Sequence, residues 1–458
     1  MSDIAQYVHR HRSRFIDELS QFLRIPSIST DPEHRRDVLQ CAGYVAGALR
    51  RLGMQRVEVF STPGHPLVYG EWLEATERPT ALVYGHYDVQ PADPLVLWDT
   101  PPFEPSVRDG QLYARGAADD KGQVFMHWKA IEALWQLHGR LPLNLKFIFE
   151  GEEEIGSRHF DPFLASHANL LAADVAIVSD TAMFARGYPS ICYGLRGLAY
   201  FQVTVFGPSH DLHSGSFGGG IANPALVLAQ LLASLKDEHN RIAIAGFYDD
   251  VVLPTAEERR QIASLPFAEE AAARELGVPA LSGEEGYCFL EQVWLRPSVD
   301  VNGIWGGFTG PGSKTIIPSQ ATAKVSLRLV PNQDPNRIAD RFERHLQAAC
   351  PQGARLQIER MEAARAVVVP RDNAFVRAAA RAVAQGFGKE PVFIRSGGTI
   401  GAAASISARL GIPIVMFGIG LPDAQTHAPN EHLDLDNLFR GIVSVAHMWE
   451  ELATIGKA

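Results

Sequence analysis

The sequence predicts an α/β fold in which a mostly parallel, doubly wound sheet is interrupted by an inserted α+β sandwich. Short apolar runs alternate with helical segments at both ends of the chain, which is the pattern of a parallel sheet with helices on both faces. The middle of the chain instead alternates apolar and polar residues, as strands with one solvated face do. Because 458 residues exceed what one hydrophobic core usually serves, we expect two domains.

The first part of the chain supplies helices and strands for the parallel sheet. Apolar residues at helical spacing predict helices over 4–24, 34–53 and 124–137. Compact apolar runs predict strands over 57–60, 66–72, 81–84, 143–149 and 174–178. Polar groups follow three of these strands, namely His86 with Asp88, a cluster of glutamates, and Asp180. Since functional groups in open α/β sheets gather beyond the carboxyl ends of the strands, we expect these groups to lie close together.

Four glutamates crowd the end of one predicted strand, in the stretch KFIFEGEEEIGS at residues 146–157. Carboxylates so close together raise one another's pKa and destabilise a fold unless a positive charge lies among them. A solvated acidic loop is the simpler interpretation of such a run, and a bound cation is the alternative. The stretch by itself leaves both interpretations open.

The pattern changes near Gly197 and changes back after Asp372. The middle segment predicts helices over 224–235 and 337–349 and strands over 199–206, 299–304, 321–330 and 355–359. Between them, the acidic, alanine-rich residues 238–286 suggest helix around 256–275. The last segment predicts helices over 374–385, 400–410 and 435–452 and strands over 392–394 and 412–417. The predicted domains are therefore 1–194 with 372–458, and the insertion 195–371.

Composition excludes several classes of function. The 42 basic and 52 acidic residues give 42 − 52 = −10, which argues against a nucleic-acid groove or an anionic membrane surface. The N-terminus lacks the apolar core of a signal peptide, and no stretch is long and apolar enough to span a bilayer, so we expect a cytoplasmic protein. The four cysteines are widely scattered, which is typical of reduced thiols rather than of a thiolate zinc site.

Five pieces of the chain carry potential metal ligands. They are His86, Asp119, the glutamate cluster, Asp180 and the late His427. Two histidines with several carboxylates suit zinc, manganese or cobalt better than calcium, and the number of ligands is enough for two ions. Each piece has a simpler interpretation alone, such as a core histidine or an aspartate that caps a helix. A shared metal cluster explains all five pieces and also relieves the repulsion among the glutamates.

These residues lie in motifs that resemble a known family. The motifs are GHYDVQPA (85–92), RGAADDKG (115–122), EGEEEIGS (150–157), VSDT (178–181) and the late His427. Together they are similar to the carnosinase-like dipeptidases, within the dinuclear zinc hydrolases that include carboxypeptidase G, aminoacylase and succinyl-diaminopimelate desuccinylase. The resemblance covers nearly the whole chain. It implies a metallopeptidase whose inserted domain is a lid and dimerisation domain.

The resemblance also implies roles for the metal-site residues. His86 and Asp180 would hold one ion, Glu154 and His427 would hold the other, and Asp119 would bridge both, with Zn²⁺ expected and Mn²⁺ or Co²⁺ as alternatives. Asp88 would orient the imidazole of His86, where its simpler interpretation is a loop cap. Alignment on the family pattern E-G-x-E-E-x-G-S makes Glu153 the general base. The family further implies a non-prolyl cis peptide between Asp119 and Asp120.

The inserted domain carries a second set of family motifs. The D-L-H-S-G motif implies that His213 reaches the active site of a partner subunit and stabilises the oxyanion, so the expected assembly is a homodimer. Nearby His210 is expected to be an ordinary loop histidine. The carboxylate of the substrate would be bound by Arg328, Thr315 and Thr399. The simpler interpretations are an exposed strand arginine for Arg328 and a helix N-cap for Thr399.

Three functions remain after these observations. The first is hydrolysis of the amide bond in dipeptides or short peptides with a free C-terminal carboxylate, by a metal-activated water with Glu153 as general base. The second keeps the metal site but removes an N-acyl group from amino acids. The third is a metal-binding protein without activity. Since both histidines, Asp119, Asp180 and the glutamates are all present, the third is the least favoured.

Overall fold

The computed structural model describes residues 2–456, which divide into two compact units. The first unit runs to Tyr193 and resumes with Val369–Ile394 and with the chain from Ile400 onward. The second unit comprises Gly194–Val368 and the short segment Arg395–Thr399. Two strands, β8 (Ser190–Leu195) and β16 (Val392–Ser396), run from the first unit into the second. No helix in the described range is long and apolar enough to cross a membrane.

The first unit is built on a large mixed sheet with a parallel centre. Its strands follow the order β1-β2-β6-β3-β7-β17-β8. The four central strands are β6 (Asn144–Glu150), β3 (Thr80–His86), β7 (Val175–Val178) and β17 (Ile414–Met416), and neighbours among them are parallel. The edge strands β1 (Arg56–Phe60) and β2 (Leu67–Trp72) are antiparallel to this core. A mixed α/β architecture is thus confirmed.

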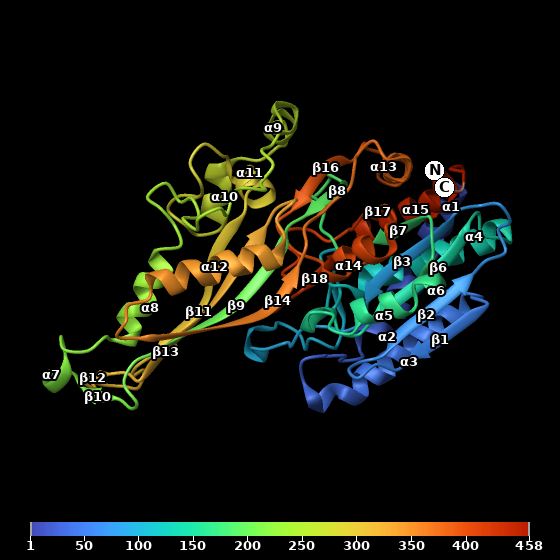
Figure 1. Cartoon of the computed structure of the whole chain (residues 1–458). Coiled ribbons are helices and arrows are strands. Elements are labelled where there is room, and N and C mark those ends of the chain that lie inside the picture. The colour runs from blue at the N-terminus through green and yellow to red at the C-terminus, as the bar shows by residue number, and fades with distance from the viewer. Residues whose placement is uncertain (1, 457–458) are drawn as a thin grey trace. The chain divides into compact units, whose positions relative to one another are not determined.

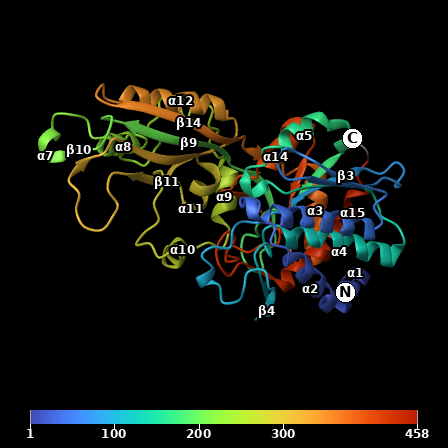
Figure 2. The same ribbon diagram turned by 90° about the horizontal axis from the view of Figure 1, so that it is seen from below.

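Helices cover both faces of this sheet, as Figure 2 shows. On one side lie α5 (Phe160–Ser166) and α14 (Gly401–Leu410), which pack on each other. The other side carries α3 (Arg35–Arg51), α4 (Lys121–His138), α13 (Ala374–Phe387) and α15 (Leu435–Leu452). Because every residue of β6 is buried between these two layers, apolar side chains face both of them, with Phe147, Ile148 and Phe149 in succession.

One predicted helix is wrong in its extent. The expected helix over 4–24 consists of two helices, α1 (Asp3–Arg10) and α2 (Arg12–Leu23). His11 lies between them with φ −107° and ψ 11°, and its imidazole Nδ1 lies 2.8 Å from the carbonyl oxygen of Tyr7. A side chain that bonds the preceding turn can interrupt a helix without changing its apolar spacing, which is why the pattern did not reveal the break.

The second unit contains a four-stranded antiparallel sheet with helices packed against it (Figure 1). Its order is β11 (Ser298–Gly306), β13 (Gln320–Leu329), β9 (Gly197–Phe206) and β14 (Arg355–Ala364). Helices α8 (Pro224–Ala233) and α12 (Pro335–Ala349) pack on β9 and its neighbours through an apolar core that includes Val203, Leu228 and Phe342. Two short helices, α9 (Ala256–Ala263) and α10 (Glu269–Glu275), confirm the helix expected within 256–275.

Candidate metal centre

The predicted metal ligands of the first unit converge at the carboxyl edge of the parallel strands. His86 is the last residue of β3, and its cross-strand neighbour Glu150 is the last residue of β6. Asp180 follows β7 by two residues. Because neighbouring central strands are parallel, their carboxyl ends meet at one edge, and polar side chains that follow different strands come together there.

Asp119 lies between the two histidines. Its Oδ1 is 3.0 Å from Nε2 of His86, and its Oδ2 is 2.9 Å from Nε2 of His427. One potential ligand atom from each of His86, Asp119 and Asp180 lies within 4.8 Å of the others, and the same holds for Asp119, Glu154 and His427. The residues therefore form two adjoining groups that share one carboxylate. Imidazole nitrogens and carboxylate oxygens in this number fit zinc, manganese or cobalt.

The loop that presents Asp119 has the backbone geometry that the family resemblance implied. The Asp119–Asp120 peptide bond is cis, and α4 begins directly after it at Lys121. Asp120 occupies the N-cap position but makes no side-chain cap hydrogen bond. Its Oδ2 instead accepts a hydrogen bond of 3.2 Å from the backbone N–H of His86. The helix-cap interpretation is thus wrong for Asp120, whose carboxylate holds the backbone at the end of β3.

The crowded glutamates separate into distinct environments. Glu150 is buried and accepts hydrogen bonds from the hydroxyls of Tyr84 and Ser157, and Glu152 accepts one from the backbone N–H of His65. Glu154 points to the metal centre, with Oε2 3.2 Å from Nε2 of His427. Glu153 belongs to neither ligand group within the described residues. A solvated loop is therefore wrong for this stretch, since its carboxylates are buried or face the metal centre.

Burial and like charge make this edge of the sheet favourable for cations. Burial raises the pKa of both Glu153 and Asp180 well above the usual range, and the neighbouring carboxylates raise it further. Hydrogen bonds to Asp119 and Glu154 raise the pKa of His427 to about 10. The raised pKa values of the two carboxyl groups and of His427 indicate an excess of negative charge at a site that is largely shielded from water. Divalent cations bound by these ligands would relieve that excess.

Asp88 contacts the imidazole of His86 and also has a second function, which the sequence did not indicate. His86 Nδ1 lies 3.1 Å from the backbone carbonyl oxygen of Asp88 and 3.4 Å from its carboxylate Oδ1. The carboxylate also accepts hydrogen bonds from the backbone N–H groups of Glu153, at 3.3 Å, and Glu154, at 3.1 Å. The fully buried Asp88 side chain therefore fixes the turn that carries both glutamates.

Glu431 is a buried part of the centre that sequence reasoning missed. One of its oxygens accepts from the backbone N–H groups of Ala118, at 2.9 Å, and Asp119, at 3.1 Å. The other accepts from Arg115 Nη1 at 2.7 Å and from the N–H of Gly116 at 3.0 Å. Four donors from the loop before Asp119 thus end on one carboxylate. A glutamate close after His427 was the only signal in the sequence, and spacing alone gave it no role.

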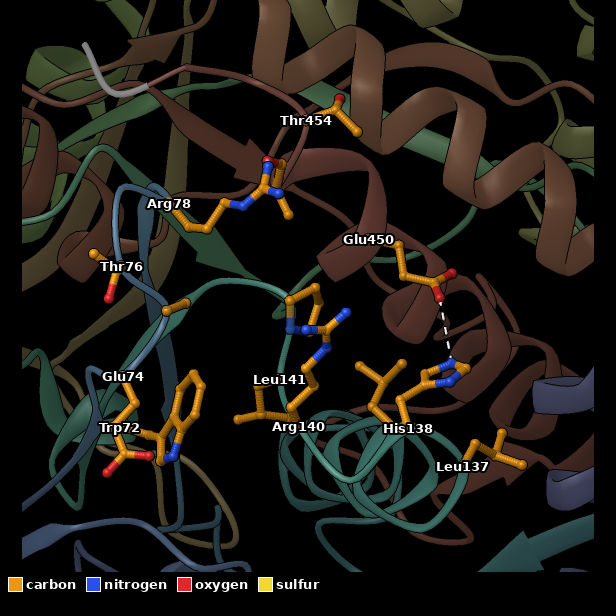
Figure 3. Close-up of a pocket in the computed structure, with 14 residues that line it drawn as sticks. Trp72, Glu74, Thr76, Arg78, Leu137, His138, Arg140, Leu141, Glu450 and Thr454 are labelled. Carbon is orange, nitrogen blue, oxygen red and sulfur yellow. Dashed lines mark hydrogen bonds and ion pairs between the residues drawn. The ribbon is translucent and has the colours of Figure 1, made fainter.

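A pocket of about 960 Å³ lies at the opposite, amino-terminal edge of the same strands, and Figure 3 shows its lining. Trp72 and Arg78 border it just before β3, and His138 lies at the end of α4. His138 Nε2 is 3.6 Å from Oε1 of Glu450, which extends from α15. This pocket contains none of the predicted metal ligands.

The remaining predicted site residues belong to the second unit. His213 ends β10 (Leu212–His213), and its Nδ1 accepts hydrogen bonds from the backbone N–H groups of Gly215 and Ser216. Neutral His213 therefore carries its proton on Nε2, which is free to donate. Thr315 is exposed, and its carbonyl oxygen accepts from the N–H of Ser214 at 3.0 Å. His210 is exposed, with Nδ1 3.0 Å from the hydroxyl of Ser209.

Arg328 and Thr399 are brought together in the second unit. Arg328 lies on β13, opposite Leu198 of β9, and its Nη1 donates to the hydroxyl oxygen of Thr399 at 2.9 Å. The N-cap of α14 is Ile400, without a side-chain cap bond, so the helix-cap interpretation of Thr399 is wrong. Arg328 is also not an exposed strand arginine, because it is only partly accessible to solvent.

Comparison with known proteins places the chain in a family. Relatives include the Cys-Gly metallodipeptidase dug1 of Schizosaccharomyces pombe, 30% identical with 99% of each chain covered, and the human Beta-Ala-His dipeptidase, 31% identical with 99% of this chain and 93% of that protein covered. A solved structure of the Saccharomyces cerevisiae dipeptidase Dug1p matches with a TM-score of 0.88 at 29% identity, covering 99% and 98% of the two chains. The family model of peptidase family M20/M25/M40 matches residues 82–451. The chain therefore belongs to peptidase family M20/M25/M40.

Proposed function

We propose that this protein is a metal-dependent dipeptidase that cleaves the amide bond of dipeptides or short peptides with a free C-terminal carboxylate. The observation that carries the proposal is the shared position of Asp119, whose two carboxylate oxygens each lie about 3 Å from the Nε2 of a different histidine. Relatives over nearly the full chain length are named as a Cys-Gly metallodipeptidase and a Beta-Ala-His dipeptidase, which supports the substrate class.

Two divalent cations, most suitably Zn²⁺, are proposed to occupy the centre. His86 and Asp180 would hold one, Glu154 and His427 the other, and Asp119 both. The two adjoining groups of ligand atoms, each within 4.8 Å, support this division. Both histidines direct Nε2 to the shared carboxylate, as ligating imidazoles should, and His86 is held from behind by Asp88 through its other nitrogen.

Glu153 is the proposed proton carrier. When bound, the two cations would lower the pKa of a water molecule and polarise the amide carbonyl. Glu153 would take the proton from that water and later give it to the departing amine. Its position supports this role, because it is adjacent to the ligand Glu154, lies outside both ligand groups of the described chain, and keeps a high proton affinity through burial. Asp88 would set its position through the backbone.

The second unit is proposed to be the lid and dimerisation domain, with boundaries near 195 and 371. In a homodimer, His213 of each subunit would donate from Nε2 to the oxyanion in the partner's site, and the hydrogen bonds to its Nδ1 support that orientation. Arg328 and Thr315 would recognise the carboxylate of the substrate, with Thr399 hydrogen-bonded to Arg328. Arginine suits this role because its planar fork matches a carboxylate.

A substrate panel combined with metal analysis tests the proposal. Protein purified without chelators should contain close to two equivalents of divalent metal per chain, and should hydrolyse Cys-Gly, β-Ala-His or related dipeptides faster than N-acetyl or N-succinyl amino acids. Asp119→Asn serves as the control, and it should lose both metal and turnover. Fast deacylation with inert dipeptides would instead identify an N-acyl-amino-acid amidohydrolase. Bound metal without hydrolysis of any amide would identify a non-catalytic protein.

A further inference from the structure

The proton of Thr399 is already used within the second unit. Its hydroxyl donates to the backbone carbonyl oxygen of Arg196 at 2.7 Å, and it accepts from Arg328 Nη1 at 2.9 Å. A hydroxyl has one proton to donate. In this arrangement Thr399 therefore has no proton for a carboxylate, and its direct effect is to hold the guanidinium of Arg328.

Arg196, whose carbonyl oxygen accepts from Thr399, carries a guanidinium that has no role so far. Its backbone N–H donates to the carbonyl oxygen of Gly398 at 3.1 Å, and its Nε donates to that of Gly397 at 3.0 Å. Its Nη1 donates to the carbonyl oxygen of Arg296 at 3.2 Å. These bonds fix the plane of the guanidinium. They leave Nη2 without a hydrogen-bond partner among residues 2–456.

Arg196 and Arg328 both contact Thr399 at the start of β9. Arg196 directly precedes this strand, Arg328 pairs with its second residue, Leu198, and the two arginines hydrogen-bond the same hydroxyl through the Arg196 carbonyl oxygen and Arg328 Nη1. Burial, together with the nearby charge of Arg328, lowers the pKa of Arg196 to about 10. The two cations are therefore close to each other as well as partly desolvated.

Neither cation forms an ion pair with a carboxylate of the described chain, although Asp300 acts on both arginines, and Glu362 on Arg328, from farther away. Other partly buried arginines of this unit form such pairs, because Arg296 pairs with Glu284 and Arg395 pairs with Glu258. Within the described part of the chain, no carboxylate forms an ion pair with Arg196 or Arg328. Two partly desolvated like charges without a carboxylate in contact are costly, and an anion bound by both would offset the cost.

We propose that Arg196 and Arg328 together form a two-guanidinium site for the C-terminal carboxylate of the substrate. Arg196 is the specificity-determining residue that completes the site, and Thr399 is a positioning residue that acts through Arg328. This inference rests on the proposed function, because it assumes a substrate with a free C-terminal carboxylate. The chemistry is that of a carboxylate that accepts charge-assisted hydrogen bonds from two arginines.

The test compares free dipeptides with their C-terminal amides. For wild type, Arg196→Gln and the surface control Arg337→Gln, KM and kcat are measured with Cys-Gly and β-Ala-His and with the corresponding amides. Arg196→Gln should raise KM for the free dipeptides about 10- to 100-fold, the usual effect of losing a hydrogen bond to a charged group. Its kcat/KM for the amides should change less than about twofold, and Arg337→Gln should match wild type.

Several outcomes overturn the inference without affecting the proposed function. An unchanged KM in Arg196→Gln, or an equal rise for acids and amides, would give Arg196 a purely structural role. If Arg196→Gln fails to fold, Arg196→Lys is used instead. Lysine keeps the positive charge but lacks the planar guanidinium, so the KM of this variant should rise for the free dipeptides and not for the amides. A wild-type protein that hydrolyses no dipeptide would instead refute the proposed function itself.

Thr399 is tested by a double-mutant cycle. Thr399→Ser should retain the wild-type KM, and Thr399→Val should raise it for the free dipeptides. If Thr399 acts through Arg328, the double variant Thr399→Val with Arg328→Gln should have the same KM as Arg328→Gln alone. Additive effects would show that the hydroxyl contacts the substrate directly, and would refute the positioning role.

Discussion

Replacement of Glu431 by glutamine should be one of the most damaging conservative changes in the first unit. Each oxygen of Glu431 accepts from two N–H donors, one of which belongs to the guanidinium of Arg115. A glutamine amide has one oxygen and one NH₂ group, so in either orientation two of the donors face another donor. The change also removes the negative charge beside Arg115, which is as deeply buried as Glu431 itself.

The expected magnitude follows from that burial. The side chains of Arg115 and Glu431 are 1% and 0% exposed, so the arginine would be left as an unpaired buried charge. Removing one partner of a buried ion pair costs about 3–5 kcal/mol of unfolding free energy. As a control, Asp436→Asn removes the carboxylate charge from the exposed ion pair of Asp436 with Arg440. This substitution should lower the unfolding free energy by less than about 1 kcal/mol. Because Glu431 holds the backbone N–H of Asp119, Glu431→Gln should also weaken metal binding.

Urea unfolding of chelator-treated protein, followed by tryptophan fluorescence, measures the first effect, and metal titration measures the second. Arg115→Met removes the guanidinium that Glu431→Gln leaves without a negative partner. The loss of unfolding free energy in the double variant should therefore be smaller than the sum of the losses in the two single variants, by about 1–3 kcal/mol. A Glu431→Gln variant as stable as Asp436→Asn, with unchanged metal affinity, would refute the assignment of Glu431 as the anchor of the Asp119 loop.

Three other predictions address catalysis and pH. Glu153→Gln should abolish turnover with both metal equivalents retained, and loss of metal would mean that Glu153 and Glu154 have exchanged roles. His213→Ala should lower kcat about 100-fold or more, whereas His210→Ala should have little effect, so equal losses would remove the assignment of His213. Although burial opposes it, hydrogen bonds from Arg14 and Lys129 lower the pKa of Glu132 from 4.5 to about 2. The folded state therefore gains stability from ionised Glu132, by about 3 kcal/mol above pH 4.5. This gain should shrink as pH falls toward 2, so the difference in urea midpoint between wild type and Glu132→Gln should narrow. A difference in urea midpoint that does not change with pH would contradict the stabilising role of ionised Glu132.

The sequence was sufficient to predict the α/β architecture and the residues that meet at the candidate metal centre. Buried parallel strands are rich in apolar residues, and the residues that follow them must lie at one edge, so the positions of His86 and Asp180 could be predicted from the sequence alone. The buried strand β8 was not predicted, because its six residues of mixed character have no clear periodicity. The break at His11 was missed for the related reason that a side-chain bond leaves the apolar spacing intact.

Only the tertiary structure decided how the functional side chains are held. Glu431 and Asp119 are 312 residues apart, and Thr399 and Arg196 are 203 apart, so no local pattern connects them. Hydrophobic periodicity reports burial along one element, but a hydrogen bond depends on where two distant elements meet and on how many donors and acceptors each group has. The sequence by itself determined which chemical groups are available to the site. The fold decided that Glu431 anchors the Asp119 loop and that the Thr399 hydroxyl donates its hydrogen bond to the carbonyl oxygen of Arg196.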